Sequence, residues 1–264
     1  MIADERLPIR VRRVLSVESG LNDGIATPVV TFCIASAATA LGLVEHDYDD
    51  GISALGELAI GVGVGAGVAL VGGRLLIISH RHAWLQHGSR RLAALALAFI
   101  AFLVAGELGG NPFVAAFVGG LVFGTAARTE AAESVELTEL TGGLLSLVLW
   151  FIFGAGFVLP AFDDLDVRIV LYAVASLTVV RVVPVAIALV GSGQGRITAA
   201  FIGWFGPRGL ASAVFALLAV EELGNTDPRV EAAINTIAVT IVFSIVAHGV
   251  TARPLATRYV EAVR

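Results

Sequence analysis

The stretch LTGGLLSLVLWFIFGAGFVLP, residues 140–160, decides the fold class. It contains no charged side chain, and it matches the length of about 20 residues with which a helix crosses the hydrocarbon core of a bilayer. Apolar runs of similar length recur along the chain, and most Asp, Glu and Arg residues lie in the short segments between them. A soluble domain would interleave its charged and apolar residues. The sequence therefore predicts an all-α, polytopic helical membrane protein.

Composition points the same way. The chain is 57% hydrophobic and 15% charged, with a mean hydropathy of +0.88, whereas soluble domains carry roughly 25% charged residues. The net charge of -5 says little about partners, because the sign of the charge varies along the chain. We expect the chain to have the lipid bilayer, and no nucleic acid, as a partner.

Long apolar runs bounded by charge predict about eight transmembrane helices in a single transmembrane domain covering residues 1–264. The predicted spans are 19–42, 53–78, 92–108, 112–127, 140–160, 168–190, 197–221 and 232–252. The fourth span is short and rich in glycine. Its start is marked by Asn111 as N-cap and Pro112 at the first helical position.

Charge asymmetry predicts the orientation of these spans. When the connecting segments are sorted into alternate faces, nearly all of the loop Arg residues fall on one face, while Arg168 and Arg229 fall on the other. Cytoplasmic loops carry the excess of basic residues. We therefore expect a multi-pass protein of the cell membrane with both termini in the cytoplasm.

Asp23 is an acid inside the first apolar run, and ionisable groups inside membrane spans are functional candidates because they are costly to keep there. Helical spacing places Glu18 beside Asn22, and Ser19 beside Asp23, as i,i+4 neighbours. This patch offers hard oxygen ligands for a small cation, and burial of Asp23 would let H⁺ and Na⁺ compete for its carboxylate. The alternative is that Asp23 caps a helix near the interface.

Arg181 lies deep in the sixth predicted span, where a guanidinium needs an anion or carbonyl partners. Glu18 is the natural partner, and such an ion pair would hold two helices in register, since Arg stays protonated and cannot exchange a proton. The alternative is that Arg181 extends to the membrane interface.

The segment FIGWFGPRGLAS at 201–212 predicts a discontinuous helix, since Pro207 cannot donate to the carbonyl of Gly203 and Gly209 follows Arg208. Transporters place broken helices at their substrate sites, where freed carbonyls act as ligands. The alternative is a proline kink with Arg208 facing a water-filled vestibule. We find no metal-ligand spacing, nucleophile elbow or phosphate loop, so we expect no enzyme, no catalytic residue, no cofactor and no metal beyond a transported cation.

Four motifs together resemble the monovalent cation/proton antiporter family of the NhaP and sodium/hydrogen exchanger type. They are ESGLNDG at 18–24, GGNPFVAAFVGGLVFG at 109–124, RVVPVAIAL at 181–189 and GPRGLASAVFALL at 206–218. The resemblance covers essentially the whole chain in the family's order, and its first and last motifs are the more specific ones.

The resemblance implies exchange of Na⁺ or K⁺ for H⁺ by alternating access. Asn22 and Asp23 would form the ion site, Ser19 would help to coordinate the cation, and Glu18 with Arg181 would form a stabilising ion pair. Pro207, Arg208 and Gly209 would belong to a discontinuous helix of an inverted-repeat fold. An Asn-Asp pair is also the family's mark of electroneutral exchange.

The chain also departs from the family's pattern. Its first motif comes near the N-terminus, so the family's N-terminal spans and their Thr-Asp-Pro motif are not matched, and the Thr226-Asp227-Pro228 triplet follows the core instead. The runner-up is therefore a non-transporting remnant, or a half-transporter subunit that needs a separate N-terminal half. A channel and a membrane-embedded enzyme are more distant alternatives. Family members commonly form homodimers, and the sequence leaves monomer and dimer both open.

Overall fold

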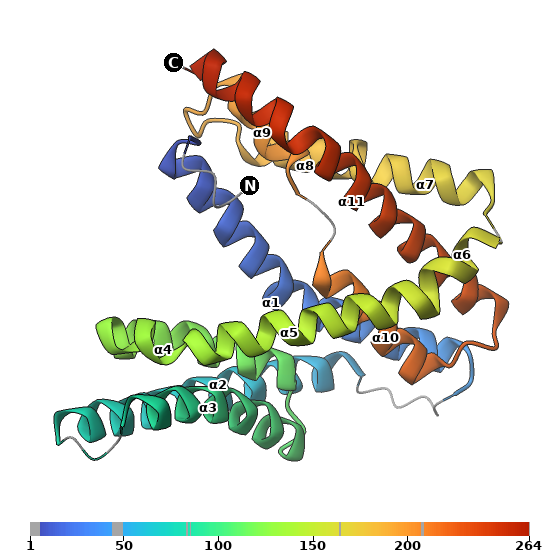
Figure 1. Cartoon of the computed structure of the whole chain (residues 1–264). Coiled ribbons are helices and arrows are strands. Elements are labelled where there is room, and N and C mark those ends of the chain that lie inside the picture. Colours follow the sequence, from blue (N-terminus) through green and yellow to red (C-terminus); the bar gives the residue numbers. More distant parts are fainter. Residues whose placement is uncertain are drawn as a thin grey trace. The chain divides into compact units, whose positions relative to one another are not determined.

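The computed structural model describes residues 6–43, 50–82, 84, 86–163, 165–206 and 209–263. Every regular element in these residues is helical, which confirms the all-α prediction (Figure 1). In chain order the elements are α1 (Ile9–Ala40), α2 (Asp50–Arg81), α3 (His87–Glu107), α4 (Pro112–Ser134), α5 (Glu136–Phe153), the π-helical turn η1 (Gly154–Val158), α6 (Leu159–Asp163), α7 (Val167–Leu177), α8 (Val179–Ala188), α9 (Arg196–Trp204), α10 (Leu210–Leu223) and α11 (Pro228–Val263).

Helix length and hydropathy identify a polytopic membrane protein. Within the described residues, five helical stretches are long and apolar enough to cross a bilayer: Leu55–Arg81, Gly88–Glu107, Glu136–Asp163, Val167–Ala188 and Pro228–Val263. Shorter apolar helices cover Val29–Ala40 and Pro112–Ala126. The total of eight spans stays a prediction.

The contacts between residues divide the chain into two units. The first unit comprises residues 1–22 and 148–264, and the second comprises residues 23–147. The boundaries fall inside α1 and α5, so each of these helices contributes residues to both units.

In the second unit, α2, α3 and α4 pack side by side (Figure 1). Small residues permit the contact between α2 and α4, since a Cβ atom on Gly65 would overlap the backbone of Ala115, and one on Gly61 would lie 2.7 Å from the carbonyl oxygen of Asn111. The glycine-rich stretch 61–73 therefore serves close helix packing, as small residues commonly do between membrane helices.

Asn111 fixes the start of α4. Its Oδ1 atom accepts hydrogen bonds from the backbone N–H groups of Phe113 and Val114, both at 3.1 Å. Its own N–H donates to the carbonyl oxygen of Glu57 on α2 at 2.9 Å. Asn111 is thus an N-cap, as predicted, and it also ties α4 to α2.

In the first unit, α11 contacts α6, η1, α7, α9 and α10. One apolar cluster joins the start of α1 to α9 and α11, and comprises Leu7, Val11, Leu15, Phe201, Ile202, Phe205, Ala256 and Tyr259. The ring of Phe201 stacks on that of Tyr259 with centroids 4.3 Å apart, and the hydroxyls of Thr198 and Tyr259 lie 3.1 Å apart. These contacts hold α9 in place up to the point where its helix stops.

Candidate functional site

α1 carries the predicted exchange site on a continuous helical backbone from Ile9 to Ala40. The i,i+4 relations of Glu18 to Asn22 and of Ser19 to Asp23 follow directly from this backbone. The side chains of Ser19, Asn22 and Asp23 lie outside what the structure describes. Glu18 is therefore the member of this patch whose side chain can be placed.

Glu18 forms an ion pair with Arg181, between Oε1 of the carboxylate and Nη1 of the guanidinium. The pair joins α1 to α8 within the first unit. Both side chains are largely enclosed, since that of Glu18 is 24% exposed and that of Arg181 is 16% exposed. An ion pair in such surroundings is costly to break, because removal of either partner leaves the other as an uncompensated charge in a largely enclosed site.

The guanidinium of Arg181 also lies against Gly206, which follows the end of α9. A Cβ atom at position 206 would overlap the Cζ and Nε atoms of Arg181, so an alanine there would displace the guanidinium. Within the described residues, the Nε and Nη2 atoms of Arg181 are buried and have no hydrogen-bond acceptor. Buried donors in folded proteins are normally satisfied, so Glu18 alone does not complete the environment of Arg181.

The helix containing the GPRG motif is discontinuous. α9 ends at Trp204 and α10 begins at Leu210, with Phe205 and Gly206 outside both helices. Gly209 has an extended backbone, with φ at -112° and ψ at -157°, and stands at the N-cap of α10. The predicted site residues Pro207 and Arg208 lie outside the described residues.

His248 on α11 lies near the end of the eighth predicted span, and no role was predicted for it. Its side chain is buried, at 6% exposure, and its Nε2 atom lies 2.8 Å from the carbonyl oxygen of Trp204. The ring packs against the indole of Trp204, with centroids 5.3 Å apart. The signal that could have found it is a titratable group inside an apolar span, the same signal that singled out Asp23.

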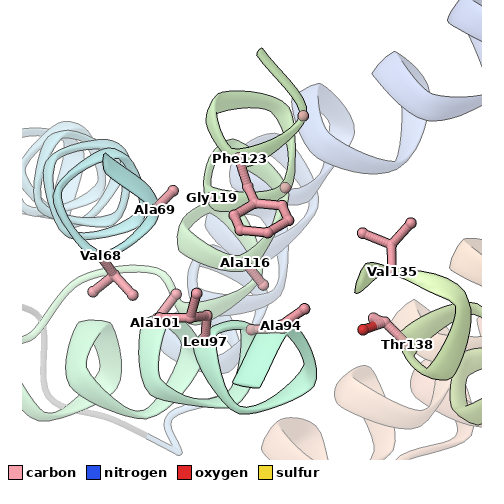
Figure 2. Close-up of a pocket in the computed structure, with 13 residues that line it drawn as sticks. Val68, Ala69, Ala94, Leu97, Ala101, Ala116, Gly119, Phe123, Val135 and Thr138 are labelled. Atoms are coloured by element: carbon pink, nitrogen blue, oxygen red, sulfur yellow. The ribbon is translucent and has the colours of Figure 1, made fainter. Parts of the chain in front are cut away.

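A separate cavity of about 200 Å³ lies in the second unit between α2, α3, α4 and the start of α5 (Figure 2). Its lining is almost wholly apolar, with Leu97 and Phe123 among many Ala and Gly residues, and Thr138 supplies a hydroxyl. Its lining residues include no carboxylate. A small cation would find no charged ligand there, so this cavity is separate from the candidate ion site.

The Thr226-Asp227-Pro228 triplet has a structural role at the start of α11. The Asp227 carboxylate accepts from the Arg229 backbone N–H at 2.7 Å and from its guanidinium at 2.9 and 3.1 Å. The side-chain hydrogen bond from Arg229 is the main cause that lowers the pKa of Asp227. The triplet therefore caps a helix, which accounts for it without an ion-binding role.

The chain was compared with protein families and with solved structures. The comparison with solved structures found no match. The family described as "Sodium/hydrogen exchanger, transmembrane" matches residues 2–258, which is nearly the whole chain. This is a family of membrane transporters rather than enzymes, with cations and protons as substrates. The apolar helices, the Glu18–Arg181 pair and the discontinuous helix all lie in the chain that this family matches. The chain therefore belongs to the sodium/hydrogen exchanger transmembrane family.

Proposed function

We propose that the chain exchanges one monovalent cation, Na⁺ or K⁺, for one H⁺ through the carboxylate of Asp23, with Asn22 and Ser19 as neutral ligands. The observation that carries this proposal is the Glu18–Arg181 ion pair beside the end of α9. The pair commits one of the two carboxylates on this part of α1 to a permanent cation, because the guanidinium does not lose its proton. Asp23 is then the carboxylate of the patch that remains to bind H⁺ or a metal cation.

Electroneutral exchange follows from a single exchanging carboxylate. Asp23 carries a metal cation across the membrane in one direction and a proton in the other. Either bound ion neutralises the same single negative charge. The Glu18–Arg181 pair contributes no net charge in either state. Each cycle would then move one charge in each direction, so the exchange rate should not depend on membrane potential.

Alternating access would expose Asp23 to one side of the membrane at a time. The interruption between Trp204 and Leu210 supports this mechanism, because broken membrane helices supply backbone carbonyls to ions and allow the two helical halves to move separately. The positive-inside pattern supports an orientation with both termini in the cytoplasm.

The test is cation-dependent dissipation of a pH gradient in everted membrane vesicles that contain the parent chain or Asp23→Asn. We expect activity in the parent and none in the variant, since an amide cannot carry the exchanged proton. Glu107→Gln is the matched control, because its exposed carboxylate lies at the end of α3 and outside the patch. Equal activity in the parent and Asp23→Asn would overturn the proposal.

Two further measurements refine the result. Equal exchange rates in proteoliposomes with and without an imposed membrane potential would support electroneutrality, and a strong dependence on potential would contradict it. If the parent chain alone is silent, activity restored by co-expressing the N-terminal spans of a family member would support the half-transporter alternative set out from the sequence.

A further inference from the structure

The carbonyl group of Trp204 marks the last turn of α9 and has two hydrogen-bond donors. The backbone N–H of Gly206 donates to it at 3.0 Å, and His248 approaches it from α11 with Nε2 at 2.8 Å. In an uninterrupted helix this carbonyl would accept from the residue four positions ahead. His248 thus supplies, from another helix, a donor at the place where the helix stops.

The direction of this hydrogen bond follows from its chemistry. A carbonyl oxygen can only accept, so a hydrogen bond to Trp204 requires a proton on the Nε2 atom of His248. The other ring nitrogen, Nδ1, lies 2.7 Å from the carbonyl oxygen of Ser244 and 3.2 Å from the Ser244 hydroxyl. A neutral ring protonated at Nε2 can accept from that hydroxyl, and a ring protonated at both nitrogens can also donate to that carbonyl. The bond from Nε2 to Trp204 is retained in both of these states, whereas the other neutral tautomer, with its proton on Nδ1, would donate to Ser244 instead.

We propose that His248 is a positioning residue of the ion site, which fixes the C-terminal end of α9 by donating through Nε2 to the carbonyl of Trp204. This inference rests on the proposed function. It concerns the placement of backbone carbonyls and assigns no proton to be carried by His248 itself.

The consequence concerns the carbonyls that precede Trp204. Pro207 has no N–H and cannot serve that of Gly203, and Gly203 is buried. Trp204 already has two donors, which is the full capacity of a carbonyl oxygen, so it is not a free ligand. The carbonyl of Ile202 loses its helical donor as well, because the N–H of Gly206 donates to Trp204 instead. The carbonyls of Ile202 and Gly203 then have capacity for a cation, and their direction depends on where His248 holds the end of α9.

The first experiment does not depend on transport. ¹⁵N NMR of histidine-labelled protein reports which ring nitrogen bears the proton, and the resonance absent from His248→Gln identifies His248. At alkaline pH we expect the neutral ring to be protonated at Nε2. Protonation at Nδ1 instead would overturn the proposal, since Nε2 could not then donate to Trp204.

The second experiment measures the cation KM and maximal rate of exchange for His248→Leu and His248→Gln. Leucine keeps an apolar side chain but has no donor, and we expect it to raise the KM roughly three- to tenfold, the factor that loss of one hydrogen bond commonly produces. Glutamine keeps an N–H donor, so we expect it to restore the KM of the parent. Because His248 keeps its bond in both protonation states, the pH profile should retain its shape.

Thr251→Val is the matched control. The Thr251 hydroxyl accepts from the indole Nε1 of Trp204 at 2.9 Å, so this variant loosens another α9–α11 contact and leaves the Trp204 carbonyl untouched. We expect lower thermal stability and an unchanged KM. A KM raised equally in His248→Leu and Thr251→Val would overturn the positioning role and show a general loss of packing.

The two proposals fail in different ways. If antiport is unaffected by Asp23→Asn, the proposed exchange site is wrong. The NMR measurement still decides whether His248 donates to Trp204. Antiport that requires Asp23 but has the parent KM in His248→Leu overturns the role of His248 and leaves the exchange site standing.

Discussion

Removal of both partners of the Glu18–Arg181 pair should destabilise the protein by less than the sum of the two single removals. Glu18→Gln removes the carboxylate that neutralises the guanidinium of Arg181. The Nε and Nη2 atoms of Arg181 already have no acceptor among the described residues. Breaking a fully buried pair costs about 3–5 kcal/mol. Because the two side chains are 24% and 16% exposed, we expect each single variant to lose about 2–4 kcal/mol of unfolding free energy.

The double variant tests the reasoning. With Glu18→Gln and Arg181→Gln together, no uncompensated charge remains, so the loss should be smaller than the sum of the two single losses by about 1–3 kcal/mol. The assay is unfolding in mixed detergent micelles by SDS titration, applied to the parent, both single variants and the double variant.

The exposed Asp227–Arg229 pair provides the control cycle. Its guanidinium is 74% exposed, so Asp227→Asn and Arg229→Gln should show little coupling. If Glu18 and Arg181 prove as additive as this surface pair, the ion pair does not link α1 to α8 energetically, and the support that it lends to the exchange mechanism is lost.

Three other substitutions test separate parts of the structure. Gly206→Ala should displace the guanidinium of Arg181 and reduce antiport and thermal stability together; full activity would show that the contact is not needed. Gly65→Val should cost about 1–3 kcal/mol by forcing α2 away from α4, whereas Gly63→Val, with open space around it, should cost less, and equal losses would contradict the packing argument. The pKa of Asp227 is lowered from 3.8, so its carboxylate stabilises the folded state above that pH and ceases to do so as the pH falls through the lowered value. Asp227→Ala should therefore lower the melting temperature at pH 6 but not at strongly acidic pH, and a deficit that persists in acid would refute this origin.

The sequence predicted the fold class because lipid imposes a compositional rule that is visible without a structure. Long apolar segments must be helical in a bilayer, since every backbone group needs an internal partner. The cap at Asn111 and the interruption between α9 and α10 were likewise predictable, because amide side chains, proline and glycine act on the adjacent backbone.

The lengths of the helices were harder to predict from the sequence. α1 begins at Ile9 although the predicted span begins at residue 19, and α11 continues to Val263 although its predicted span ends at residue 252. Hydropathy marks the part of a helix that lies in lipid, and an Arg-rich continuation in water can remain helical. The interruption at Thr178 was also unpredicted; its hydroxyl donates to the carbonyl of Val174 at 2.7 Å, a back-bond that commonly bends helices.

The partners of polar groups across helices depend on tertiary packing. Charge complementarity was enough to suggest Glu18 for Arg181, because few acids lie inside spans. Nothing local to Trp204 indicates that its carbonyl accepts from a residue 44 positions away. The sequence could therefore name the discontinuous helix but not the side chains that hold its ends.

The interruption of α9 would be costly in lipid if its backbone groups were left alone, since each unsatisfied group there costs several kcal/mol. Two helices reach the three residues at its end. His248 from α11 donates to the carbonyl of Trp204, and Arg181 from α8 lies against Gly206 while it remains paired with Glu18 on α1. Because α8 and α11 both reach this short segment and α8 is paired with α1, a change of charge on α1 acts through Arg181 on a backbone that is held from two sides. The ion pair and the histidine thus make the discontinuity a defined structural position rather than a flexible kink.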